Sequence, residues 1–266
     1  MTPWLDVCRD AVGDIKAVLA ELPTRVEREP VLQTGEGGDE TTAIDAAAET
    51  AVVHRLEQLD ESFTLVSEEL GERTFGSGGA WRVVLDPIDG SLNAKRDIPF
   101  FSLSLAVAEG ATMGDVVWGY VYDFGTGEEW TAERGKGAFL NGERLGRVRP
   151  KDTIEILSFE ATTTAEVAER AGQMVGSAHR LRIMGSLALS LCHLAAGRVD
   201  AVCSLKPARS VDIAAGQLLV RECGLAIDLF EDPPFEQAPL DLAGRSRVVA
   251  AGTTELCRTL EAALTA

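Results

Sequence analysis

The chain has 266 residues, of which 45% are hydrophobic, and its 42 acidic residues outnumber 25 basic ones to give a net charge of −17. This length allows one large domain or two smaller ones with a sizeable core. The negative charge repels nucleic acids and anionic membranes, so we expect neither as a partner. An anionic small molecule would also be repelled, unless cations are held at its binding site.

Arginine is four times as frequent as lysine, with 20 arginines and five lysines. An acidic surface poor in lysine is typical of adaptation to high salt, where dense ions screen self-repulsion. An ordinary acidic protein from a GC-rich genome has the same composition, so both explanations stay open. The five scattered cysteines form no CxxC pair and indicate reduced, buried thiols. With no signal-peptide pattern and no apolar run long enough to span a membrane, we expect a cytoplasmic protein.

The first part of the chain mixes helices with antiparallel strands. Apolar residues at helical spacing predict an amphipathic helix over residues 3–22. Glycine-rich stretches at 34–39 and 71–80 predict loops. The remaining predictions are a helix over 42–59, strands over 63–67, 81–85, 100–108, 113–123 and 128–133, and a hairpin or tight turn over 135–142.

After Pro150 strands and helices alternate, which predicts a layered α/β arrangement. The predicted strands are 154–159, 181–184, 199–204, 225–229 and 247–251, and the predicted helices are 164–175, 186–197, 211–223 and 254–264. We therefore divide the chain into an α+β subdomain, residues 1–150, and an α/β subdomain, residues 151–266.

The segment Asp86-Pro87-Ile88-Asp89-Gly90-Ser91 follows a predicted strand. Pro87 stiffens the backbone, so two carboxylates three residues apart can point into one space with the Ile88 carbonyl between them. Such hard oxygens suit Mg²⁺. Gly90 and Ser91 begin a predicted short helix whose free N–H groups and hydroxyl could receive a phosphate. The plain alternative is a helix capped by one aspartate with a second in its first turn.

Three more acidic positions favour a site over a cap. The pair Glu68-Glu69 also follows a strand, where ligand sites of α/β layers lie. Asp212 and Asp45 each stand near the start of a predicted helix. Each acid alone is more often a cap or a solvated charge.

Taken together, these motifs resemble the inositol monophosphatase superfamily, which includes archaeal enzymes that also cleave fructose 1,6-bisphosphate. The matching segments are WRVVLDPIDGS at 81–91, VSEE at 66–69, SVDIAAG at 210–216, TTAID at 41–45, WTAERGKGAFLNG at 130–142 and Gly185-Ser186 before an apolar helix. The resemblance implies the sugar-phosphatase fold, an αβαβα layered sandwich with an antiparallel sheet in the N-terminal half and a mixed sheet in the C-terminal half.

The resemblance also implies the site. Glu68, Asp86 and the Ile88 carbonyl would bind a first Mg²⁺, and Asp86, Asp89 and Asp212 a second. Asp45, with Glu68, would help to hold a weaker third ion, and Glu68 and Ser91 would orient a metal-activated water. Asp89, Gly90, Ser91, Gly185 and Ser186 would contact the substrate. The family usually carries Thr where this chain has Ser91, which keeps the hydroxyl. Lithium inhibition and a homodimer are further family expectations.

One departure bears on the substrate. Inositol-preferring animal relatives carry a glutamate about seven residues before the last metal aspartate, where this chain has Leu205, followed by Lys206 and Arg209. Basic side chains favour a second phosphate, so we expect fructose 1,6-bisphosphate or dual specificity. The alternatives are a 3'(2'),5'-bisphosphate nucleotidase, a non-catalytic regulatory protein on the same fold, and a simple divalent-cation binding protein. His54, His179 and His193 match no pattern. We expect core or surface roles for His54 and His193, whereas His179, in a predicted loop near Arg180 and Arg182, could approach the substrate.

Overall fold

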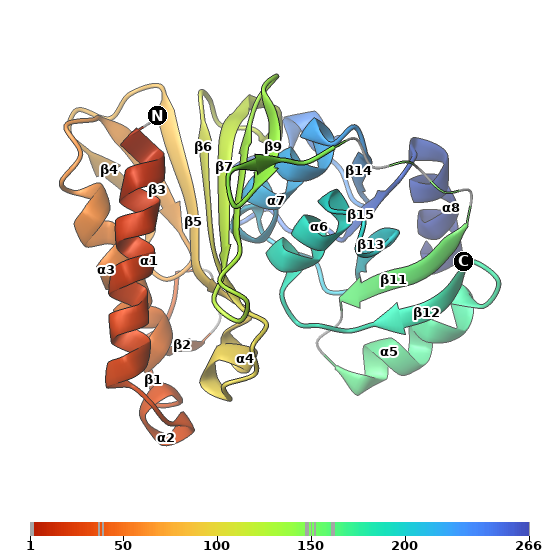
Figure 1. The fold of residues 1–266 in the computed structure, drawn as a ribbon, viewed down its shortest axis with the longest axis horizontal. Coiled ribbons are helices and arrows are strands. Elements are labelled where there is room, and N and C mark those ends of the chain that lie inside the picture. The colour runs from red at the N-terminus through yellow and green to blue at the C-terminus, as the bar shows by residue number, and fades with distance from the viewer. Residues whose placement is uncertain are drawn as a thin grey trace.

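The computed structural model describes residues 3–36, 38, 40–146, 149, 151, 153–160 and 163–265, which form five layers (Figure 1). Helices α1 (Pro3–Glu21) and α3 (Ala43–Leu56) cover the outer face of an eight-stranded sheet. Helices α6 (Leu187–Ala195) and α7 (Ser210–Glu222) lie between this sheet and a five-stranded one. Helix α8 (Thr254–Thr265) covers the far face of the smaller sheet. The predicted αβαβα sandwich is confirmed.

The large sheet has the strand order β10-β9-β8-β7-β6-β5-β3-β4. Only β3 and β5 run parallel, and the other neighbours are antiparallel. Its strands are β3 (Phe63–Ser67), β4 (Gly71–Phe75), β5 (Trp81–Asp89), β6 (Ser102–Ala108), β7 (Val116–Asp123), β8 (Glu129–Glu133), β9 (Gly137–Leu140) and β10 (Glu143–Arg144). The parallel pair is what matters for function, because the carboxyl ends of β3 and β5 meet at one edge of the sheet.

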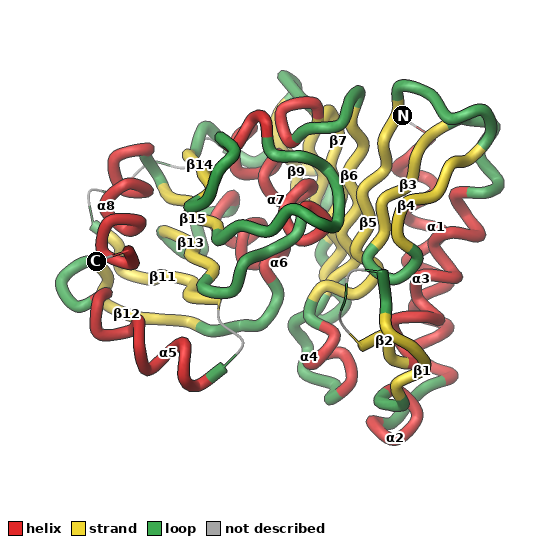
Figure 2. The backbone as a smooth tube through the Cα atoms, turned by 180° about the vertical axis from the view of Figure 1, so that it is seen from behind, coloured by secondary structure: helices red, strands yellow, loops and turns green. Residues whose placement is uncertain are grey.

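The small sheet is mixed, with the order β12-β11-β13-β15-β14. Strand β11 is parallel to β12 and to β13, and β15 is antiparallel to both of its neighbours. Its strands are β11 (Ile154–Glu160), β12 (Ala178–Arg182), β13 (Ala201–Ser204), β14 (Ala226–Leu229) and β15 (Val248–Ala251). The rear view shows α6 and α7 between the two sheets (Figure 2). The carboxyl ends of β3, β5, β11 and β13 contribute Glu68, Asp89, Glu160 and Ser204 to the lining of one cavity.

The two halves of the chain share a core. The predicted boundary at residue 150 lies outside the described residues. Helices α6 and α7 pack their buried faces against both sheets. Helix α1 buries an apolar stripe at helical spacing against the outer face, consisting of Trp4, Cys8, Ala11, Val12 and Ile15. A division into subdomains at residue 150 stays a prediction.

Several local predictions were wrong. Residues 71–75 form β4 rather than a loop, because they pair with β3 along its full length. The strand predicted over 113–123 begins with a short 3₁₀ turn, Met113–Asp115, and the helix predicted over 164–175 divides into α5 (Thr164–Arg170) and a 3₁₀ turn, Ala171–Met174. Strand β12 begins at residue 178 and ends at 182, earlier than predicted.

The remaining elements are short. They are α2 (Arg25–Arg28), β1 (Val31–Thr34), β2 (Glu40–Thr42), α4 (Ser91–Lys95) and the 3₁₀ turn Phe235–Gln237. The loop predicted over 34–39 lies between β1 and β2, and its residues 37 and 39 lie outside the described residues. Among the helices of the described chain, none has the length and apolar character that a membrane span requires.

Candidate metal and phosphate site

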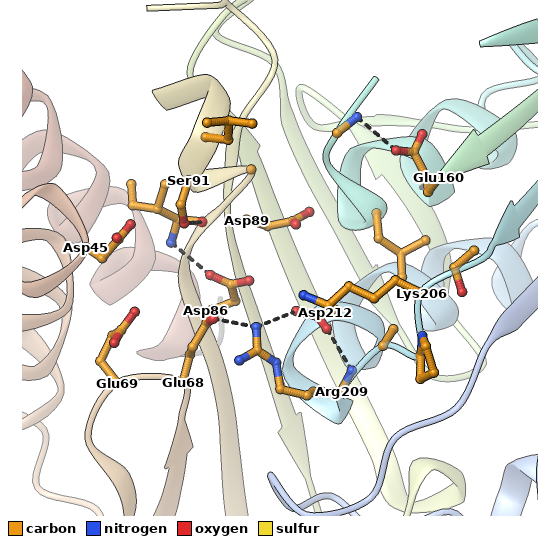
Figure 3. A pocket seen from close by; sticks show the side chains of 18 of the residues that line it. Asp45, Glu68, Glu69, Asp86, Asp89, Ser91, Glu160, Lys206, Arg209 and Asp212 are labelled. Atoms are coloured by element: carbon orange, nitrogen blue, oxygen red, sulfur yellow. Dashed lines mark hydrogen bonds and ion pairs between the residues drawn. The ribbon is translucent and has the colours of Figure 1, made fainter. Parts of the chain in front are cut away.

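A cavity of about 530 Å³ opens where the two sheets present their carboxyl ends to each other. Carboxylates reach it from both halves of the chain, and several converge at its centre (Figure 3). Among the described residues, its acidic lining consists of Glu40, Asp45, Glu68, Glu69, Asp86, Asp89, Glu160 and Asp212, and its basic lining of Lys95, Lys206, Arg209 and Arg245. The acids outnumber the bases by eight to four, so the cavity has a local excess of negative charge.

A β-bulge in β5 explains why Asp86 and Asp89 share the cavity. Side chains three positions apart in a regular strand point to opposite faces. Asp86 pairs with Ser104 and Asp89 with Ser102, so three steps along β5 match two along β6. The extra residue turns both carboxylates to the same side. Pro87 fits there because it has no N–H to donate to the ladder. The prediction that the strand ends at residue 85 was therefore wrong, since it continues through the bulge to Asp89.

Glu68, Asp86 and Asp212 form the carboxylate cluster of the site. Each offers an oxygen within 4.8 Å of the others, although Asp212 comes from the distant helix α7. Two oxygens on one Mg²⁺ at about 2.1 Å each lie up to roughly 4.2 Å apart. The three carboxylates therefore need only a small approach to share a cation, and hard oxygens are the right donors for Mg²⁺.

Burial disfavours the ionised form of these acids. Desolvation raises the pKa of Asp86 well above its usual range, and the neighbouring Glu68 and Asp89 carboxylates add to the effect. Burial raises the pKa of Glu68 to about 8, although Arg209 opposes the shift. A bound divalent cation would reverse this balance, because it stabilises the charged carboxylates.

Asp89 is held by the N-terminus of α6. Its Oδ2 accepts a hydrogen bond of 2.6 Å from the Ser186 hydroxyl and one of 2.7 Å from the Ala188 N–H. Burial raises the pKa of Asp89 to about 7, with Asp212 adding to the shift and the two hydrogen bonds opposing it. Ser186 and Gly185, predicted to contact the substrate, thus lie beside the site, and Ser186 also positions Asp89.

Asp45 and Glu69 lie on the side of the cavity nearest α3. Asp45 completes a capping box, in which its Oδ2 accepts hydrogen bonds from the Thr42 N–H at 3.1 Å and the Thr42 hydroxyl at 2.5 Å. Its other oxygen is buried and has no hydrogen-bond partner among the described residues. The cap interpretation and the site interpretation are therefore compatible, because one oxygen caps the helix and the other is available to a ligand. Glu69 accepts a hydrogen bond from Thr41.

Gly90 and Ser91 form the turn into the short helix α4. Gly90 has a φ of 96° and packs closely beneath the backbone carbonyls of Phe100 and Gly185. The Ser91 hydroxyl donates a 3.0 Å hydrogen bond to the Ile88 carbonyl, the oxygen predicted to bind a metal. The predicted helix start is confirmed.

The basic residues after β13 differ in their surroundings. Lys206 is exposed at the cavity wall, and Leu205 is buried. Arg209 is only 6% exposed, and its guanidinium forms an ion pair with Glu68 and lies 3.6 Å from the Oδ1 of Asp212. Its contact with a substrate stays a prediction, but its contact with the carboxylate cluster is a finding that the sequence did not suggest.

Sequence reasoning also missed Glu160 and Arg245. Glu160 ends β11 and is nearly buried, where it accepts hydrogen bonds of 2.8 Å from the hydroxyls of Ser158 and Ser190 and from the Gly185 N–H. The strand-end argument that selected Glu68 would have found it. Arg245 reaches the cavity from the loop before β15 and belongs to no pattern.

No histidine is among the described residues that line the cavity. His179, which we expected in a loop near the substrate, belongs to strand β12 instead. His54 and His179 are exposed. His193 packs against the rings of Phe100 and Trp130.

Comparison with known proteins places this geometry in a family. The model of the inositol monophosphatase family matches residues 5–265. A fructose-1,6-bisphosphatase/inositol-1-monophosphatase of Methanothermobacter thermautotrophicus is 33% identical over 263 residues, covering 95% of this chain and 93% of that protein. The Nus factor SuhB of Salmonella typhimurium is 34% identical over 264 residues, covering 94% of each. The crystal structure of an inositol monophosphatase-fructose 1,6 bisphosphatase matches with a TM-score of 0.85 at 28% identity, covering 99% of this chain and 100% of that one.

Proposed function

The chain belongs to the inositol monophosphatase family, and we propose that it is a Mg²⁺-dependent phosphomonoesterase that hydrolyses fructose 1,6-bisphosphate and inositol monophosphate. The single observation that supports this most is the convergence of Glu68, Asp86 and Asp212 from three separate segments on one cavity. Carboxylates this close repel one another when they are ionised, and a bound divalent cation would stabilise all three charges.

The family resemblance supplies the proposed cation ligands, and the convergence of Glu68, Asp86 and Asp212 supports them. Glu68, Asp86 and the Ile88 carbonyl would hold one Mg²⁺, Asp86, Asp89 and Asp212 a second, and the buried, unpartnered oxygen of Asp45 would assist a third. When bound, the ions supply positive charge for the phosphate and lower the pKa of water.

The protein itself would position the reactants. The N–H groups at Gly90 and Ser91 would receive the phosphate, and the Ser91 hydroxyl, with Glu68, would orient the attacking water. Asp89 keeps one orientation because Ser186 and Ala188 hold its outer oxygen. Loss of either partner would let the carboxylate rotate away from the cavity.

The preference for a bisphosphate would depend on the basic side chains of the cavity. Lys206 and Arg245 line the same cavity as the carboxylate cluster, and both would pair with a second phosphate of the substrate. Leu205 is buried and is not among the described residues that line the cavity, so the missing acid at this position is an argument from the family resemblance alone. We therefore place fructose 1,6-bisphosphate first and inositol monophosphate second.

The test is phosphate release with Mg²⁺ from fructose 1,6-bisphosphate, inositol 1-phosphate and adenosine 3',5'-bisphosphate, measured side by side. We expect the highest kcat/KM for fructose 1,6-bisphosphate. A preference for the adenosine compound would favour the nucleotidase alternative, and the absence of turnover on all three would refute the enzyme proposal.

A regulatory role without catalysis is the second candidate, since a relative named Nus factor SuhB aligns with 94% of the chain. The retention of all the acids expected in the family argues for catalysis. We further propose a cytoplasmic homodimer inhibited by lithium, as expected for the family. The five buried, free cysteines fit a reducing compartment. Size-exclusion chromatography with light scattering tests the dimer.

A further inference from the structure

We infer that Arg209 is a built-in competitor for the metal: its guanidinium occupies the carboxylate cluster when no ion is bound and must leave Asp212 before a divalent cation can bind there. This inference rests on the proposed function only in taking Mg²⁺ as the ion that the cluster holds.

Arg209 contacts two of the three carboxylates of the cluster. Its Nη2 pairs with Oε1 of Glu68 and lies 3.6 Å from Oδ1 of Asp212. Its backbone N–H donates a 2.7 Å hydrogen bond to Oδ2 of the same aspartate. Arg209 therefore engages both oxygens of Asp212, one through its side chain and one through its backbone. A cation that binds Asp212 has to displace at least the side chain.

The positive charge of Arg209 lies at an unfavourable position in the fold. Arg209 is the N-cap of α7, a 13-residue helix, and the N-terminus of a helix disfavours a positive charge. The side chain is also almost fully buried. A buried guanidinium at the positive end of a helix is stable only because carboxylates surround it. The carboxylate cluster and Arg209 thus compensate each other in the absence of an ion.

Arg209 can neutralise only part of the charge of the ionised carboxylate cluster. One guanidinium faces three carboxylates, Glu68, Asp86 and Asp212, so the cluster carries a negative excess once its acids are ionised, as they would be around a divalent cation. The guanidinium also lines the cavity, where a phosphate could accept its N–H groups in a forked pair. Transfer of Arg209 from Asp212 to the phosphate would vacate a metal position at the moment of substrate binding. Metal and phosphate would then bind cooperatively.

The test measures Mg²⁺ binding alone, by calorimetry on the full-length protein without substrate. Arg209→Met keeps the bulk of the side chain and removes its charge, and Arg209→Gln is a polar second variant for the case that Met impairs folding. Lys95→Met is the matched control, because Lys95 lines the same cavity with the same charge and its described contacts do not include the carboxylate cluster. It measures the effect of deleting one positive charge from the cavity.

We expect both Arg209 variants to bind Mg²⁺ at least tenfold more tightly than the wild type, and Lys95→Met to change the affinity less than threefold. Saturating inorganic phosphate should tighten Mg²⁺ binding to the wild type and have little effect on Arg209→Met. Thermal unfolding should show the Arg209 variants less stable than the wild type without metal and more strongly stabilised by Mg²⁺.

Equal or weaker Mg²⁺ binding by both Arg209 variants, or an equal gain in Lys95→Met, would overturn the inference. The proposed function fails separately: a wild type that binds Mg²⁺ in this pattern but releases no phosphate from any substrate would refute the enzyme proposal and leave the role of Arg209 intact.

Discussion

Substitution of Gly90 by alanine probes the turn that we assign to the phosphate. A Cβ at this position would lie 3.1 Å from the carbonyl oxygens of both Gly185 and Phe100, and 3.2 Å from the Cβ of Phe101. Two of these neighbours are backbone atoms, which cannot rotate away. The φ of 96° adds a conformational penalty of about 1–2 kcal/mol for an L-residue, and the close contacts add roughly 1–3 kcal/mol.

The reduced freedom of the unfolded chain offsets at most about 1 kcal/mol of this loss. We therefore expect Gly90→Ala to lower the free energy of unfolding by roughly 1–4 kcal/mol in urea denaturation. We also expect it to lower kcat/KM at least tenfold, because the turn beside Asp89 shifts. Gly13→Ala is the matched control. Gly13 is exposed within α1, and apart from its own helix backbone nothing lies within 4 Å of the position that a Cβ would take, so alanine should stabilise the fold by about 0.5–1 kcal/mol. A loss below about 0.5 kcal/mol in Gly90→Ala would refute the steric reasoning.

Three further predictions concern single side chains. Asp89→Asn should abolish turnover and change the melting temperature little, because the amide oxygen can still accept the hydrogen bond from Ser186. Near-normal activity would contradict the assignment of Asp89 as a metal ligand. Lys206→Ala should raise the KM for fructose 1,6-bisphosphate at least fivefold and spare inositol 1-phosphate, and an equal loss on both would contradict its assignment to the second phosphate. Burial raises the pKa of Glu49, although hydrogen bonds from Ser67 and Leu70 oppose the shift. The folded protein therefore loses stability as the pH rises from the unfolded-state pKa of Glu49 through its folded-state pKa. Glu49→Gln should therefore gain stability relative to the wild type between pH 4 and pH 8 in chemical denaturation, and a constant difference across that range would contradict the shift.

The strand-end positions were predictable from the sequence, because apolar runs followed by acids recur at 63–69 and 81–89. The bulge was not. Nothing in the residue pattern shows that Pro87 and Ile88 together oppose a single residue of β6, so the common direction of Asp86 and Asp89 needed the strand register. Strand β4 was missed because its polar, glycine-flanked sequence resembles a loop, and pairing with β3 outweighs that local preference.

The position of Arg209 shows the limit of pattern reasoning more clearly. A basic residue three positions before Asp212 can point to solvent, to the substrate or back to its own helix. Its actual contact with Glu68 joins residues 141 positions apart and depends on the packing of α7 against the large sheet. Long-range contacts of this kind are set by the whole fold.

The most direct test of the central claim is phosphate release from fructose 1,6-bisphosphate by protein stripped of metal with EDTA and then titrated with Mg²⁺. The carboxylate cluster predicts no release before the titration, full activity after it, and no recovery in Asp86→Asn at any Mg²⁺ concentration. Turnover by the stripped protein, or recovery in Asp86→Asn equal to that of the wild type, would contradict it.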